Sequence, residues 1–128
     1  MKKVIITKVS DLKGFQPDFH QKIVVREPVN PKVGSQFLQF RTSRINPGGG
    51  DEYHAHPHSE QIIYILKGKG KMVIRKKPYQ VSKDMLIFIP PGVGHHIEND
   101  SKGLLQFIIL WAPPPSLVDW VPKKKKRS

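Results

Sequence analysis

Five of the six histidines in this 128-residue chain fall into two short clusters. The first cluster holds His54, His56 and His58, and the second holds His95 and His96. Neutral imidazole is the commonest protein ligand of zinc, iron, copper and nickel. The rings of a His-x-His pair on a strand lie on one face, because side chains alternate with period two. The clusters therefore predict a metal site with His54, His56 and His95 as its candidate ligands.

The remaining histidines differ in their surroundings. His96 directly follows His95 and must point to the opposite face if this segment is a strand. His58 lies beyond the His-x-His pair, and His20 stands alone in a polar segment. We expect these three side chains to be structural or solvent-exposed and not to bind the metal.

Both clusters lie within motifs that resemble those of the cupin superfamily. The first motif, G(X)5HXH(X)3-4E(X)6G, is matched with a four-residue spacer at Gly48, His54, His56, Gln61 and Gly68. The second half of the other motif, PXG(X)2H(X)3N, is matched at Pro90, Gly92, His95 and Asn99. The resemblance extends over residues 36–112. It implies an all-β fold, a double-stranded β-helix or jelly-roll cupin barrel with a ligand site in its mouth.

The resemblance also implies a set of metal ligands. In cupins the two histidines and the acidic residue of the first motif, with the histidine of the second, hold one metal ion. Carried over residue by residue, this names His54, His56, Gln61 and His95. The expected cofactor is one divalent transition metal ion. Iron, manganese, nickel, copper and zinc all stay open, because imidazole-rich sites accept each of them.

Two positions depart from the motifs. Gln61 stands where the family has glutamate. A three-residue spacer would make Glu60 the ligand instead, but Gly68 would then come one residue late, so we favour Gln61. Three imidazoles and an amide are all neutral and would leave the ion its full charge toward an anionic oxygen ligand. Asp84 replaces the first glycine of the second motif, which concerns backbone geometry and not metal binding.

Frequent turn residues favour short strands over helices. Twelve prolines and ten glycines punctuate the chain, and no long stretch carries a helical period. We expect strands at 3–9, 23–26, 36–45, 61–66, 71–75, 85–89, 95–98 and 104–110. Residues 67–70, Lys-Gly-Lys-Gly, are predicted to form a hairpin turn between two of them.

The chain is expected to form a single barrel domain at 1–112, followed by a Pro-rich and basic tail at 113–128. The three consecutive prolines at 113–115 cannot continue a strand ladder. The run of five basic residues at 123–127 resembles a nuclear-import signal, although solvated lysine-rich ends are common. The longest apolar stretch, 104–112, is far shorter than the ~20 residues of a spanning helix. With no cysteine in the chain, we expect a cytoplasmic protein that does not enter a membrane.

The charge of the chain is strongly basic. Its 22 Lys and Arg against 10 Asp and Glu give a formal net charge of +12. Without the five basic residues at 123–127 the count is 17 against 10, or +7. Such a charge attracts anionic ligands. We do not expect nucleic-acid binding, because the sequence has no reading motif and no pattern of interleaved aromatic and basic residues.

Several predicted strands are apolar at consecutive positions, as at 62–66, 85–89 and 107–110. A strand that is apolar on both faces must be covered on both faces. One face would line the barrel. The other favours a homodimer, although the first 35 residues could also fold back and cover it.

These features predict a metalloenzyme that acts on a small anionic or enolisable substrate, with dioxygenase-like or isomerase/lyase-like chemistry. The alternative is a non-catalytic cupin that binds a sugar or another small molecule. Tyr53, Tyr64 and Arg41 are candidates to reach the pocket, and residues 104–110 are expected to give it a hydrophobic lining. The acidic residues that flank the motifs, Glu52, Glu60 and Glu98, are expected to be solvated, so no catalytic residue is assigned.

Overall fold

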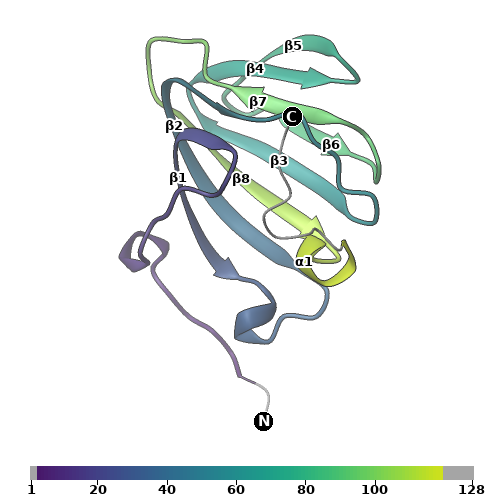
Figure 1. The fold of residues 1–128 in the computed structure, drawn as a ribbon. Coiled ribbons are helices and arrows are strands. Elements are labelled where there is room, and N and C mark those ends of the chain that lie inside the picture. The colour runs from purple at the N-terminus through teal and green to yellow at the C-terminus, as the bar shows by residue number, and fades with distance from the viewer. Residues whose placement is uncertain (1–2, 120–128) are drawn as a thin grey trace.

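Residues 3–119 are described by the computed structural model, and they form eight strands with very little helix (Figure 1). The strands are β1 (His20–Val29), β2 (Gln39–Asp51), β3 (Glu60–Lys67), β4 (Lys69–Ile74), β5 (Lys77–Ser82), β6 (Leu86–Ile89), β7 (His95–Glu98) and β8 (Leu105–Ala112). The short helices are η1 (Val9–Asp11), η2 (Pro31–Val33) and α1 (Pro115–Val118). The predicted all-β fold is confirmed.

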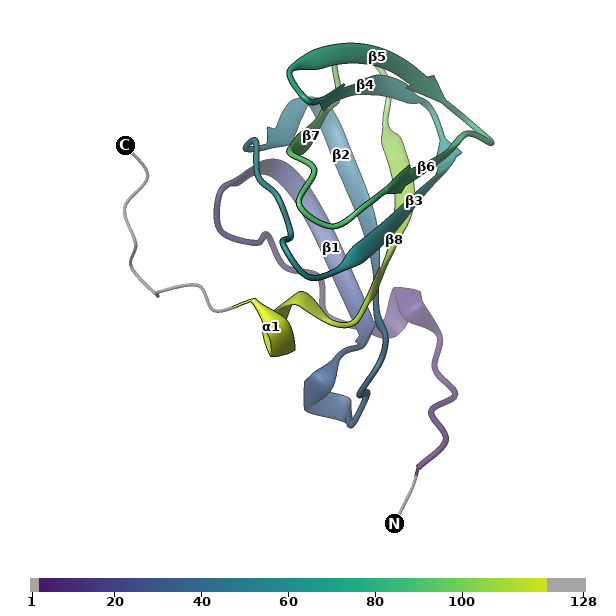
Figure 2. The same ribbon diagram turned by 90° about the vertical axis from the view of Figure 1, so that its right-hand side faces the viewer.

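The strands form one curled antiparallel sheet in the order β5-β4-β7-β2-β8-β3-β6, with β1 paired to β2. Strand β2 connects the two halves of the sheet. Its first part pairs with β8, and Gly50 near its end pairs with Glu98 of β7. The sheet thereby closes around a common interior, as Figure 2 shows. This is the jelly-roll barrel that the sequence predicted.

The interior of the barrel is filled by the inward side chains of these strands. In β8 every second residue is buried, beginning with Leu105 and Phe107, while the residues between them are half-buried. Ile45, Ile65 and Met72 complete a core in which each of these side chains is fully buried. Burying each such side chain contributes roughly 1.5–3 kcal/mol to folding.

Two predictions about strands are wrong. Residues 3–8 form no strand in the described chain, although their sequence is apolar and β-branched, and η1 follows them. Strand β5 was not predicted because its sequence is mostly polar and five of its six residues are exposed. It forms because Arg75 and Lys76, both with positive φ, make the tight turn that returns the chain against β4.

The predicted hairpin at 67–70 is also wrong, since β3 pairs with β6 and β8 whereas β4 pairs with β5 and β7. Gly68 instead carries the chain from one half of the sheet to the other. Its φ of 82° suits glycine, and a Cβ there would clash with the Leu104 carbonyl oxygen. Asp84, which replaces a motif glycine, likewise has a φ of 72°.

The chain after β8 packs against the barrel up to the last described residue. Pro114 is fully buried, and the Ser59 hydroxyl donates a hydrogen bond of 2.7 Å to the Pro113 carbonyl. The basic run at 123–127 lies outside the described residues. No helix within residues 3–119 is long and apolar enough to span a membrane.

Candidate metal centre

Backbone hydrogen bonds bring the two histidine clusters together. The amide of His54 donates to the carbonyl of His95 at 2.9 Å, and the amide of His95 donates back to His54 at 2.8 Å. The amide of Gly92, whose φ is 81°, donates to the carbonyl of His56 at 2.9 Å. The Pro-Pro-Gly turn before β7 is therefore held directly against the His-x-His segment.

This pairing places three imidazoles around one point. One ring nitrogen of each of His54, His56 and His95 lies within 4.8 Å of those of the other two. The ring centroids are 4.5 Å apart for His54 and His95, 4.9 Å for His54 and His56, and 5.7 Å for His56 and His95. The three residues that the sequence singled out are thus neighbours in the fold.

Hydrogen bonds orient two of these rings with Nε2 toward the centre. His54 Nδ1 lies 2.6 Å from the Glu52 carbonyl oxygen, and His95 Nδ1 lies 2.9 Å from that of Val93. A carbonyl oxygen only accepts, so each Nδ1 carries the proton and each Nε2 keeps a lone pair when the ring is neutral. Backbone carbonyls commonly fix metal-binding histidines in this way.

Two of the Nε2 atoms are buried without a hydrogen-bond partner among residues 3–119, those of His56 and His95. Burial lowers the pKa of His56 to about 3, and the rings of His54 and His95 add to the shift. Burial also lowers the pKa of His95 to about 4, with a further contribution from His54. Both rings are neutral at physiological pH, which is the form that binds metals.

Gln61 presents a third unpaired donor atom. Its side chain is 3% exposed, and its Oε1 is buried without a hydrogen-bond partner in the described chain. Glu60, the alternative ligand considered from the sequence, is exposed and lies on the opposite face of β3 from Gln61. Three clustered imidazoles and an amide oxygen suit a divalent transition metal ion, and three of these four side chains have a buried donor atom without a partner.

The other histidines have partners of their own. His96 Nε2 lies 2.7 Å from the Glu98 carboxylate, on the face opposite His95. His58 Nδ1 lies 2.9 Å from the Asp119 carboxylate. His20 lines the pocket described next, and its Nδ1 lies 2.7 Å from the Asp18 carbonyl oxygen. Burial lowers the pKa of His20.

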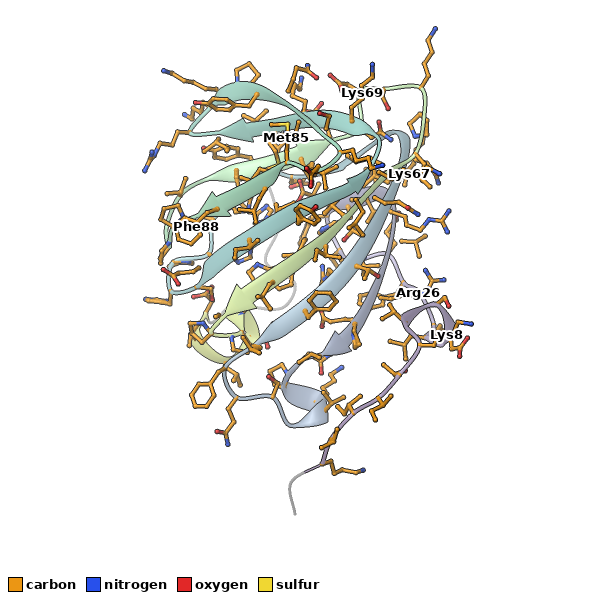
Figure 3. All side chains as sticks on the ribbon, turned by 180° about the vertical axis from the view of Figure 1, so that it is seen from behind. Lys8, Arg26, Lys67, Lys69, Met85 and Phe88 are labelled. Carbon is orange, nitrogen blue, oxygen red and sulfur yellow. The ribbon has the colours of Figure 1, made fainter. Side chains whose placement is uncertain are left out.

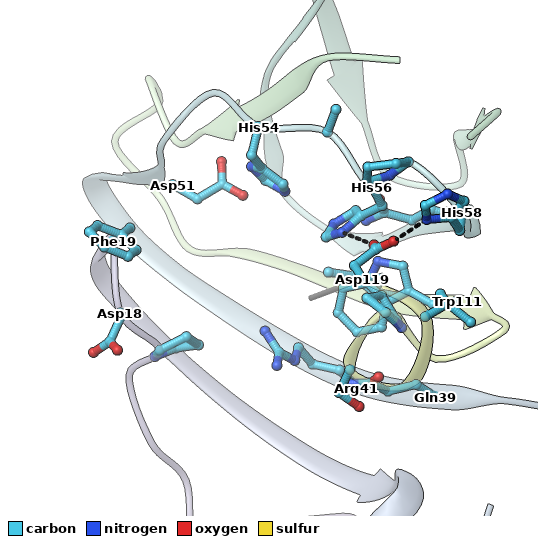
Figure 4. A pocket seen from close by; sticks show the side chains of 18 of the residues that line it. Asp18, Phe19, Gln39, Arg41, Asp51, His54, His56, His58, Trp111 and Asp119 are labelled. Atoms are coloured by element: carbon cyan, nitrogen blue, oxygen red, sulfur yellow. Dashed lines mark hydrogen bonds and ion pairs between the residues drawn. The ribbon is translucent and has the colours of Figure 1, made fainter. Parts of the chain in front are cut away.

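The histidines open into a pocket of about 980 Å³ (Figure 4). Its apolar lining includes Phe19, Ile109, Trp111 and Leu117. Ile109 is the sole lining residue from the apolar run at 104–110. The Trp111 ring packs edge-on against His56 at 5.8 Å between centroids, which places an aromatic surface beside the candidate metal site.

Arg41 reaches the pocket, as the sequence suggested. Its guanidinium lies 5.0 Å from the centre of the Trp111 ring and pairs with Glu27 at 2.7 Å. The two tyrosines do not line it. Tyr64 bonds Asp84 at 2.5 Å, and Tyr53 packs against His96.

The lining of the pocket is more acidic than the chain as a whole. Four carboxylates, Asp18, Asp51, Glu52 and Asp119, contribute to it, whereas Arg41 is its one Lys or Arg side chain in the described part of the chain. Asp51 accepts a hydrogen bond of 2.8 Å from the Ile97 amide, and burial raises its pKa. Among residues 3–119 the Lys and Arg side chains other than Arg41 therefore lie outside the lining of the pocket.

Sequence reasoning missed His20, Asp51 and Asp119 as residues of this pocket. His20 and Asp51 are cross-strand partners of β1 and β2, and no local pattern announces that pairing. Asp119 follows a proline segment that the sequence suggested was separate from the barrel.

The chain thus combines a small antiparallel barrel with three clustered histidines that could hold a metal ion. The chain belongs to the cupin domain family, whose model matches residues 41–112.

Three similar proteins illustrate this membership. An uncharacterized protein of Methanocaldococcus jannaschii, MJ1618, is 34% identical over 97 residues, which cover 75% of this chain and 78% of that protein. The polyketide synthase CurC of Streptomyces cyaneus is 25% identical over 114 residues, covering 86% and 74%. The structure of the polyketide cyclase RemF from Streptomyces resistomycificus has a TM-score of 0.72 at 22% identity, covers 89% of this chain and 82% of its own, and indicates the shared fold.

Proposed function

We propose that this chain is a metal-dependent enzyme that acts on a small, enolisable substrate carrying carbonyl or hydroxyl oxygens. The observation that carries the proposal is the cluster of three imidazoles at an open pocket that Gln61 also lines, with buried, unpaired donor atoms on His56, His95 and Gln61. The ligands would be His54, His56, Gln61 and His95. A bound divalent ion would act as a Lewis acid on a substrate oxygen, and its neutral ligands would leave its charge undiminished.

Asp51 is the proton acceptor in this proposal. It lines the pocket, and its carboxylate lies beside His54 in Figure 4. The amide of Ile97 holds one of its oxygens at 2.8 Å. The carboxylate would take a proton from the carbon next to the substrate carbonyl. The C–H electron pair would form a carbon–carbon double bond, and the π pair of the carbonyl would move to its oxygen. A positioned carboxylate with a raised pKa suits this general-base role.

The pocket lining supports a substrate with an apolar or aromatic body. Phe19, Trp111 and Leu117 would contact that body, and the surrounding carboxylates disfavour a multiply charged anion. The names of RemF and CurC, a polyketide cyclase and a polyketide synthase, support compounds with several carbonyl groups as the first class to screen. Proton transfer of this kind favours isomerase- or lyase-like chemistry over the dioxygenase alternative.

A hydrogen–deuterium exchange assay tests the proposal. The protein is loaded with iron, manganese, nickel, copper or zinc in turn and incubated with β-dicarbonyl compounds in D₂O, and exchange at the α-carbon is followed by NMR. We expect metal-dependent exchange that Asp51→Asn slows by about 10²-fold or more without loss of metal. Asparagine retains an oxygen for the Ile97 amide, so this variant tests the charge and not the fold.

Other outcomes would change the proposal. Exchange that is unaffected in Asp51→Asn would remove Asp51 from the mechanism. Oxygen consumption with the iron-loaded protein would favour the dioxygenase reading. Stoichiometric metal without turnover of any substrate would favour the non-catalytic binding protein.

We also propose that a second copy of the chain covers the outer face of β3, β6 and β8. Ile62 of β3 lies between Phe88 of β6 and Leu110 of β8, and Phe88 and Leu86 are more than half exposed (Figure 3). Phe88→Lys should turn a dimer into a monomer in light scattering, whereas Tyr79→Lys on exposed β5 should not. A monomeric natural chain would contradict this proposal. A cytoplasmic location stays a prediction from the cysteine-free sequence.

A further inference from the structure

Asp119 lies between two histidines of the first cluster, as the dashed lines in Figure 4 show. Its Oδ1 is 2.9 Å from Nδ1 of His58, and its Oδ2 is 4.0 Å from Nδ1 of His56. The side chain is 8% exposed, and Oδ2 is buried with no hydrogen-bond partner within residues 3–119. A buried carboxylate oxygen without a partner calls for an explanation, because desolvating a charged oxygen is costly.

The segment before Asp119 holds this carboxylate over the pocket. The Asp119 amide donates to the Pro115 carbonyl at 2.8 Å and closes the single turn of α1. Pro114 is fully buried, and the hydroxyl of Ser59, just before β3, donates a hydrogen bond to the Pro113 carbonyl. Residues 115–119 all line the pocket. The segment is thus anchored at Pro113 and Pro114, and the turn of α1 places the carboxylate at the pocket.

The other two candidate ligands each have an acceptor at Nδ1, and His56 needs one as well. The carbonyls of Glu52 and Val93 fill that role for His54 and His95. For His56 the acceptor that faces Nδ1 is Oδ2 of Asp119. At 4.0 Å the two atoms form no hydrogen bond, but the negative charge of Asp119 facing Nδ1 favours the proton on that nitrogen and leaves Nε2 free for a metal ion.

The charge of Asp119 has a further consequence. The candidate ligand set is neutral because Gln61 stands where the first cupin motif has a glutamate. A carboxylate that bonds the far nitrogen of a ligating imidazole makes that ring a stronger donor. Asp119 can therefore supply through His56 part of the negative charge that Gln61 does not.

We propose that Asp119 is a positioning residue of the metal centre, which selects the tautomer of His56 and strengthens it as a ligand, with His58 holding Asp119 in place. The proposal rests on the metal site put forward above. On zinc binding the Asp119–His56 distance of 4.0 Å should shorten to a hydrogen bond of about 2.7–3.2 Å.

Zinc affinity of the full chain tests this inference. The dissociation constant for Zn²⁺ is measured by chelator competition for the natural chain, Asp119→Asn, Asp119→Ala and the matched control Asp18→Asn, which removes another pocket carboxylate. Loss of an outer carboxylate typically weakens metal binding by about 10–100-fold. We expect losses in that range for Asp119→Ala, a smaller loss for Asp119→Asn, and a change under about threefold for Asp18→Asn.

A second readout separates positioning from a merely structural role. Nitrogen-15 NMR of the metal-free chain reports the tautomer of His56, which should be protonated on Nδ1 in the natural chain and mixed in Asp119→Ala. An unchanged tautomer, or a zinc affinity of Asp119→Asn and Asp119→Ala within about threefold of the natural chain, would overturn the proposal. If Ala substitutions of His54, His56 and His95 also leave zinc binding intact, the metal site itself is refuted, and not only the role of Asp119.

Discussion

Replacing Gln61 by glutamate inserts a carboxylate into a site built from neutral donors. Gln61 is 3% exposed and its Oε1 has no hydrogen-bond partner in the described chain, so the new charge would be desolvated and unpaired without metal. Leaving such a group unsatisfied costs about 2 kcal/mol, even though its pKa would rise to reduce the charge. For a chain of 128 residues this lowers the Tm by about 6–12 °C.

A bound divalent ion reverses this penalty. The carboxylate then has a partner of opposite charge, and the free energy that the metal-free state lost is recovered on binding. Because about 1.4 kcal/mol corresponds to a tenfold change, 2 kcal/mol tightens the dissociation constant by about 30-fold. Gln61→Glu should therefore be less stable than the natural chain without metal and bind zinc more tightly.

Thermal melts with a chelator and zinc titrations by competition measure both quantities. The control is Glu60→Gln, because Glu60 is exposed and faces away from the site. Equal stability and equal zinc affinity of Gln61→Glu and the natural chain would refute the reasoning. A clear loss of zinc affinity in Glu60→Gln, which should bind zinc like the natural chain, would show that the three-residue spacer was the correct alignment.

Two further predictions concern the scaffold. Burial raises the pKa of Asp51 in the folded chain, so its contribution to stability is fully present below its unfolded pKa of about 3.9 and is lost as the pH rises through the folded value. Urea melts with a chelator give the free energy of unfolding at each pH. As the pH rises through the folded pKa of Asp51, this free energy should fall less in Asp51→Asn than in the natural chain, and the same pH dependence in both would contradict this. Gly68→Ala should lower stability by about 2 kcal/mol or more, because its Cβ would clash with the Leu104 carbonyl oxygen and its φ of 82° strains an alanine. Gly103→Ala, with no atom within 4 Å, is the control, and equal melting of the two variants would count against the packing described here.

The sequence predicted those parts of the molecule that local patterns determine. Short apolar runs bounded by turn residues and the spacing of the two motifs were enough to place most of the barrel strands and to single out His54, His56 and His95. The polar strand β5 escaped notice because its formation depends on the turn at Arg75 and Lys76. The strand predicted at 3–9 does not form, because an apolar, β-branched sequence does not reveal whether a partner strand exists.

The site was predictable only near its motifs. Gln61 and the histidines carry fixed spacings, so the sequence could name them without knowing the fold. Asp51 and Asp119 enter the pocket through long-range packing, Asp119 by way of a proline segment that gives no strand or helix signal. The acidic lining of the pocket could not be predicted for the same reason, since the formal net charge of +12 does not tell which charged residues meet there.

Metal content is the most direct test of the central claim. The full chain is purified without an affinity tag or chelator, offered each candidate metal, and analysed by mass spectrometry beside the triple variant in which His54, His56 and His95 are replaced by alanine. The account predicts about one equivalent of a divalent metal per natural chain and almost none in the triple variant. A natural chain that takes up no metal, or a triple variant that retains a full equivalent, would contradict it.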